Sequence, residues 1–92
     1  SNADSLPEDL REAMLLGVRE AFHRYAAVVG KISKELIRQI DQYEDLEKLI
    51  DYVTNNLPVS YELKQQVLEA EDINDRYSII TSLPGGGYFH KE

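Results

Sequence analysis

Three short helices are predicted by residues 45–76, which read DLEKLIDYVTNNLPVSYELKQQVLEAEDINDR. Asp45, Ser60 and Asp72 each precede an apolar pattern of helical period, and short polar side chains of this kind cap helix N-termini. Pro58 disfavours helical geometry at the residue before it, so the first of these helices ends there. The apolar residues of the three patterns are Leu46, Leu49, Ile50, Val53 and Leu57; Leu63, Val67, Leu68 and Ala70; and Ile73, Tyr77, Ile80 and Leu83.

Two further helices are predicted upstream of this stretch. Ser5 and Glu8 have the spacing of a capping box at the start of a long amphipathic helix, and Gly30 suits the left-handed position that ends one. A shorter helix follows, with Ser33 as its candidate N-cap, and ends at about Asp41. The apolar stripe of the long helix comprises Leu10, Met14, Val18, Ala21, Tyr25 and Val28, widened by Leu15, Phe22 and Val29.

These patterns predict an all-α fold: a compact bundle of about five helices, with one long N-terminal helix packed against four short ones. Ninety-two residues support a single domain with a thin core. Residues 1–3 resemble the remnant of a cleaved affinity tag, and residues 4–83 form the predicted helical domain. Residues 84–92 begin with a proline and three glycines and are expected to be a flexible tail.

The composition excludes several classes of partner. The net charge is −7, from 17 acidic and 10 basic residues. Nucleic acids and anionic membranes are therefore disfavoured, because phosphate binding needs a basic patch that releases counterions. The absence of cysteine excludes disulfides and thiolate metal sites, and no apolar run reaches the ~18–20 residues of a membrane span. We expect a cytoplasmic protein that binds neither nucleic acid nor membrane.

No arrangement of residues in the sequence predicts catalysis. The phosphate-binding loop and the serine nucleophile elbow are both missing. His23 has no ligand type four residues away on its helix, so we interpret it as a boundary residue with no metal role. We predict no catalytic residue, metal site or cofactor site in this chain. One acidic group is interpreted as helix caps and solvated surface, and its members are Asp41, Glu44, Asp45, Glu47 and Asp51.

The six tyrosines are the residues most suited to binding. Tyr25 and Tyr77 fall in apolar registers and are predicted core residues. Tyr43, Tyr52 and Tyr61 lie at turns or off the main stripe, where an aromatic ring with a polar tip suits a contact surface. Partial burial with the hydroxyl in water is the alternative interpretation.

The order and spacing of these segments resemble the helical half of the N-terminal domain of the ATP-dependent Lon proteases. That family typically shows the pattern D…LAD…A…HLPL…KQ…LE..D…RL, and the resemblance covers about residues 10–83. It rests on Phe22 and Tyr25; on Lys31-Ile32-Ser33-Lys34-Glu35; on Asp45, Leu46 or Leu49, Asp51 and Leu57-Pro58-Val59; and on Lys64-Gln65-Gln66-Val67-Leu68-Glu69.

The resemblance implies a helical subdomain that follows a β-rich subdomain and helps to bind unfolded or damaged protein. It also implies other subunits of a homo-oligomer as partners. ATP and Mg²⁺ binding, and peptide cleavage by a Ser–Lys pair, would belong to later domains of the parent protein. Within this chain it implies weak binding through a shallow apolar groove between short helices. The candidate substrate-binding residues are Tyr43, Tyr52, Leu57 and Tyr61.

Some features depart from the family pattern. Pro84 and three glycines stand where the family continues into a long helix, and Tyr52 and Thr54 replace smaller alanines. A second hypothesis is therefore a stand-alone helical interaction module that is not joined to a protease. A third is a small-ligand-binding domain with a pocket between the long helix and the short ones.

Overall fold

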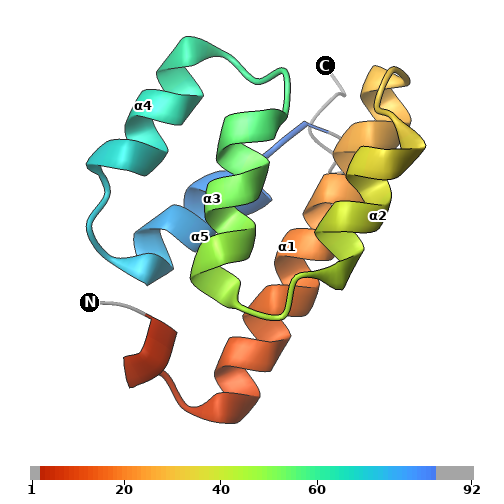
Figure 1. The fold of residues 1–92 in the computed structure, drawn as a ribbon. Helices are drawn as coiled ribbons and strands as arrows, with labels where there is room; N and C mark the ends of the chain where they lie inside the picture. Colours follow the sequence, from red (N-terminus) through yellow and green to blue (C-terminus); the bar gives the residue numbers. More distant parts are fainter. Residues whose placement is uncertain (1–2, 85–92) are drawn as a thin grey trace.

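The computed structural model describes residues 3–84, and these residues fold as helices with no strand among them (Figure 1). The elements are the 3₁₀ turn η1 (Ala3–Ser5), α1 (Glu8–Val29), α2 (Lys34–Gln42), α3 (Leu46–Asn56), α4 (Tyr61–Glu69) and α5 (Ile73–Thr81). The predicted all-α bundle is confirmed, with one long helix followed by four short ones. Of the predicted tail, Pro84 alone is among the described residues, and residues 85–92 lie outside them.

Hydrogen bonds confirm the four predicted N-caps of the short helices. Each cap leaves the chain extended before the helix and satisfies a backbone N–H that has no partner within the helix. Ser33, Asp45, Ser60 and Asp72 accept from the N–H groups of Leu36, Lys48, Leu63 and Asn74 at 3.0, 3.0, 3.1 and 2.9 Å. The predicted end of α1 is also confirmed, since Gly30 has a φ of +76° and its N–H donates to Ala26.

The N-cap position predicted for Ser5 is wrong. α1 begins at Glu8, and the N-cap position is held by the extended Pro7 rather than by Ser5. Ser5 belongs to η1 because the chain before Pro7 turns back onto α3, where the N–H of Ala3 donates to a carboxylate oxygen of Glu47 at 3.0 Å. Ala3 is buried at this contact. That residues 1–3 are a tag remnant stays a prediction.

The core lies where α1, α3 and α5 pack against one another. α3 lies beside α1 in the ribbon, with α4 on its outer side and α5 behind it (Figure 1). The whole predicted apolar face of this helix and its C-cap is confirmed as core. Its members, each at most 2% exposed, are Leu46, Leu49, Ile50, Val53 and Leu57. Burying a large aliphatic side chain contributes roughly 1.5–3 kcal/mol, so this helix supplies much of the stability.

Three residues predicted for apolar faces are exposed instead. Leu10 is 45% exposed, Val28 63% and Leu68 61%. α1 is about 33 Å long at 1.5 Å per residue, and Leu10 and Val28 lie near its two ends, outside the stretch from Met14 to Tyr25 that holds its buried residues. Leu68 follows the buried Val67 on α4 and lies about 100° further around the helix, which turns it to solvent.

Gly17 in the middle of α1 is explained by close packing against α5. A Cβ atom at this position would overlap the hydroxyl oxygen of Tyr77 and lie 3.1 Å from its Cζ atom. A glycine in a helix interior costs about 1 kcal/mol relative to alanine. At this position glycine lowers the intrinsic stability of α1 but permits the close contact with α5.

Candidate functional site

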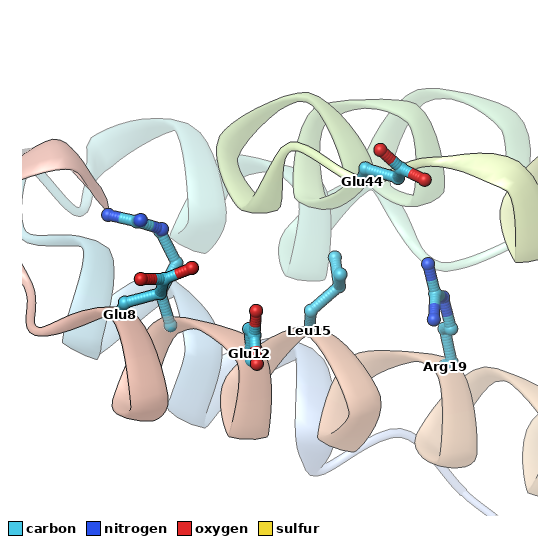
Figure 2. Close-up of a pocket in the computed structure, with 6 residues that line it drawn as sticks. Glu8, Glu12, Leu15, Arg19 and Glu44 are labelled. Carbon is cyan, nitrogen blue, oxygen red and sulfur yellow. The ribbon is translucent and has the colours of Figure 1, made fainter.

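A polar cleft of about 540 Å³ lies between the N-terminal half of α1 and the α2–α3 connection. Side chains of α1 border it on one side, and Glu44 faces them from the connection, opposite Arg19 (Figure 2). The cleft carries charges of both signs and so offers no single charge to a ligand. Its lining residues are Glu8, Arg11, Glu12, Leu15, Arg19 and Glu44.

The two arginines of this polar cleft hold backbone segments in place. Arg11 donates through Nη1 to the carbonyl oxygens of Ala3 and Leu6, at 3.3 and 3.4 Å. Arg19 donates through Nη2 to the carbonyl oxygen of Tyr43, while its Nε is buried without a partner among the described residues. These contacts fix η1 and the α2–α3 connection against α1, so we interpret the polar cleft as structural.

A second hollow lies beside this connection, along the solvent-exposed face of α3. The rings of Tyr43 and Tyr52 are packed together there, with centroids 5.0 Å apart and planes inclined by 40°. The hollow has a volume of about 310 Å³, and we call it the tyrosine hollow. Its lining residues are Tyr43, Lys48, Asp51, Tyr52, Asn55 and Asn56.

A third hollow is formed where the end of α1, the α3–α4 connection and the end of α5 meet. Its volume is about 380 Å³, and six of its eight lining residues are apolar or aromatic. We call it the apolar groove. Its lining residues are Tyr25, Pro58, Val59, Ser60, Leu63, Ser82, Leu83 and Pro84.

The two serines of the apolar groove are already engaged in hydrogen bonds. Ser60 caps α4, and the hydroxyl of Ser82 donates to the carbonyl oxygen of Ile79 at 2.6 Å. Val59 and Leu63 are half-buried, so each keeps apolar surface available to a partner. The groove therefore suits an apolar side chain better than a polar one.

Tyr25 fixes the base of the apolar groove. Its hydroxyl donates to the carbonyl oxygen of Pro58 at 3.1 Å, which ties α1 to the α3–α4 connection. Burial raises the pKa of the Tyr25 phenol above its usual value of 10.0. The neutral hydroxyl is the form that can donate this bond, so burial and hydrogen bonding both favour it.

The structure brings together two of the four predicted substrate-binding residues. Tyr43 and Tyr52 line the tyrosine hollow. Tyr61 is 75% exposed at the start of α4, next to the residues of the apolar groove. Leu57 is 2% exposed and packs in the core, so its side chain has almost no surface with which to contact a substrate. Their role in substrate binding stays a prediction.

The Lon resemblance implied a shallow apolar groove between short helices, but the residues that line this groove were not predicted. Its residues come from three places, near residue 25, over 58–63 and over 82–84. Tyr25 and Leu83 were predicted as ordinary core residues, because periodicity identifies a buried face without showing which parts of it meet at a surface. The one local signal was Val59, an apolar residue that follows a helix-ending proline.

His23 lies in a contact between α1 and α2 that the sequence did not predict. Its Nε2 is 2.8 Å from Oδ1 of Asp41, and both side chains are about half exposed. An exposed pair of this kind contributes roughly 0–1 kcal/mol. Among residues 3–84 no group of three or more His, Cys, Asp or Glu side chains could hold a metal ion. No helix of the same range is long and apolar enough to cross a membrane.

The fold and its surface hollows define a small all-α module with an apolar groove. The chain belongs to the family of substrate-binding domains of the ATP-dependent protease La (Lon), whose sequence profile matches residues 2–83.

Individual Lon proteases are similar to this chain over most of its length. It is 32% identical to the Lon protease of Lachnoclostridium phytofermentans, over 79% of this chain and 9% of that protein. It is 36% identical to the Lon protease of Fusobacterium nucleatum, over 78% of this chain and 10% of that protein. It is 32% identical to the Lon protease of Clostridioides difficile, over 89% of this chain and 10% of that protein. The chain thus spans about a tenth of the length of these relatives. No solved structure matches it significantly.

Proposed function

We propose that this chain is a non-catalytic substrate-recognition domain of a Lon-type ATP-dependent protease and binds unfolded or damaged protein segments. The observation that carries the proposal is the apolar groove, in a chain that belongs to the Lon substrate-binding domain family. An unfolded protein exposes apolar side chains that its folded form buries. A surface that accepts one such side chain therefore distinguishes the two states.

The groove favours weak and general binding. It can take one apolar side chain at a time, and full burial of such a side chain contributes roughly 1.5–3 kcal/mol before the cost of ordering the polypeptide. The hydroxyl groups of its two serines already take part in hydrogen bonds within the domain, so it offers little recognition of a particular polar sequence. Several copies in an oligomer would raise the overall affinity by increasing the effective concentration of sites.

The same proposal makes this chain one domain of a longer parent protein. Other subunits of a homo-oligomer would be partners, and ATP with Mg²⁺ would bind in later domains that also hold the peptidase. We also propose a cytoplasmic location. The sequence on either side of this segment in the intact gene product tests these points, because a phosphate-binding loop downstream would indicate the ATPase.

A titration of the 92-residue chain with one polypeptide in two states tests the central proposal. An apolar-rich polypeptide is added once unfolded and once folded, and heat or NMR shifts are measured. The unfolded form should bind and the folded form should not. Equal binding of the two forms, or undetectable binding of both, would remove substrate recognition by this domain.

A matched pair of variants places the binding in the groove. Val59→Glu puts a charge into the apolar groove and should weaken binding by about tenfold or more, because the carboxylate must be desolvated. Leu68→Glu adds the same charge at an exposed apolar residue of α4 outside the groove, and should leave binding unchanged. Equal effects of the two changes would contradict the assignment.

A further inference from the structure

The tyrosine hollow differs from the apolar groove in that it carries several side-chain hydrogen-bond acceptors, from Asp51, Asn55 and Asn56. The side-chain amide nitrogens of Asn55 and Asn56 donate to the backbone carbonyls of Asp51 and Tyr52, at 2.9 and 2.8 Å. No described residue donates to either amide oxygen, or to the carboxylate of Asp51. The hollow therefore offers acceptors that no described residue uses, and it suits a ligand group that supplies several donors.

The two aromatic rings add an attraction for cations. Tyr43 and Tyr52 lie side by side at 5.0 Å and are both half-buried, which leaves part of each ring accessible. The face of an aromatic ring is electron-rich and attracts a guanidinium or ammonium group within about 6 Å of its centre. Acceptors and rings thus favour the same kind of ligand.

The local charge has the sign that a cation requires. Residues 41–56 contain five carboxylates and a single basic residue, Lys48. One of the carboxylates, Asp41, is paired with His23 across α1 and α2. Lys48 lines the hollow and opposes a second cation there, so its removal should strengthen cation binding.

The position of Tyr43 is fixed from within the molecule. Arg19 reaches from α1 to the carbonyl oxygen of Tyr43, and the N–H of Tyr43 donates to the carbonyl of Ile40 at 3.4 Å. The ring therefore rests on an anchored connection, which lowers the ordering cost of binding.

We propose that the tyrosine hollow binds the guanidinium group of an arginine in a polypeptide substrate. A planar guanidinium carries five N–H donors and stacks on aromatic rings, so it matches this lining better than the compact ammonium of lysine does. The proposal rests on the proposed function in that the arginine belongs to a bound polypeptide. It adds a substrate preference: apolar segments that also carry arginine bind better than apolar segments that lack it.

A pair of unstructured peptides tests the preference. Both are glycine–serine peptides with the same leucine residues; one carries arginine and the other citrulline, which keeps the shape and loses the charge. The arginine peptide should bind the 92-residue chain about threefold more tightly, as expected for one exposed cation–π contact. Equal affinities of the two peptides would overturn the proposal.

Variants identify the hollow as the source of the preference. Asp51→Asn and Tyr52→Leu should each reduce the preference for arginine by about twofold to threefold, and Lys48→Gln should increase it. Glu71→Gln removes the same charge at an exposed position that does not line the hollow, and should change nothing. A preference that survives both Asp51→Asn and Tyr52→Leu in folded protein would overturn the assignment.

These experiments distinguish a failure of the arginine proposal from a failure of the proposed function. If both peptides bind and Val59→Glu weakens both equally, substrate recognition by the groove stands whatever the hollow does. If neither peptide binds the wild-type chain, both proposals fail.

Discussion

α3 and α4 are short helices that contribute in opposite ways to this domain. α3 has five buried residues in eleven and packs against α1 and α5, whereas α4 has one buried residue in nine and lies at the outer side of the bundle (Figure 1). The groove-forming connection, residues 57–60, joins them. Stability is therefore concentrated in α1, α3 and α5, whereas the surface proposed for binding combines buried residues of α1 and the end of α5 with the partly exposed Val59 and Leu63.

The largest expected effect is at the centre of α3. Ile50→Ala should lower the free energy of unfolding by about 2–5 kcal/mol, because a fully buried side chain leaves a cavity. Val67→Ala on α4 should cost about 2 kcal/mol, since valine loses two side-chain carbons where isoleucine loses three. Urea denaturation measures both losses of unfolding free energy, provided that the dependence of this free energy on urea concentration has the same slope in all the proteins.

Leu68→Ala is the control for this pair. Leu68 is 61% exposed, so its truncation should change stability by no more than about 0.5 kcal/mol. A loss at Leu68 as large as the loss at Ile50 would contradict the contrast between the two helices.

The contact of α1 with α5 should give the next largest effect. Gly17→Ala should destabilise the fold by about 1–3 kcal/mol through overlap with the Tyr77 hydroxyl, although alanine is the better helix former. In a Tyr77→Phe background the same substitution should cost less, because the oxygen nearest to the new methyl group is gone. Wild type, the two single variants and the double variant form a double-mutant cycle, and thermal unfolding of these four proteins measures the coupling between the two positions. Strictly additive losses would show that the two side chains do not meet.

Removing a helix cap should have a smaller effect, which concerns the whole domain for one cap and a single helix for the other. Asp45→Ala and Ser60→Ala each remove one N-cap bond, worth about 1 kcal/mol. At Asp45 the loss should appear in global stability, because α3 unfolds with the core. At Ser60 it should appear as faster amide hydrogen exchange confined to α4. Uniformly faster exchange across the domain in the Ser60 variant would mean that α4 is as firmly held as α3.

The smallest expected effect concerns the link between α1 and the α3–α4 connection. Tyr25→Phe removes the hydrogen bond to Pro58 and should cost about 0.5–1 kcal/mol at neutral pH. Burial raises the pKa of Tyr25, so its contribution is complete below about pH 10 and is lost as the pH rises through the higher folded value. The stability difference between wild type and variant should therefore shrink above pH 10. A difference that grows with pH would contradict this assignment.

Local signals in the sequence predicted most of the fold. Ser33, Asp45, Ser60 and Asp72 act as caps because the residue type and its distance from the first apolar position are local properties. The apolar residues of the buried face of α3 were predicted, because a helix packed on several neighbours shows a complete apolar stripe, whereas the buried Thr54 was not. The Lon resemblance, carried by the same segments, is confirmed by the family profile.

The remaining errors arose where packing between distant segments decides the outcome. Leu10 and Val28 continue the apolar stripe of α1, yet both lie outside the stretch from Met14 to Tyr25 that holds its buried residues. Ser5 matched a capping box, but the contact of Ala3 with Glu47 draws the chain away from α1. The groove joins residues that are more than fifty positions apart, so no spacing in the sequence predicts it.

The most direct test maps binding onto the isotope-labelled 92-residue chain by NMR, with an unfolded apolar polypeptide that lacks arginine. The domain should show its largest shift changes at the amides of Val59, Leu63 and Leu83, which line the apolar groove, and small changes at Leu68. Changes centred on Leu68, or a spectrum that the polypeptide leaves unaltered, would contradict the assignment of substrate recognition to this groove.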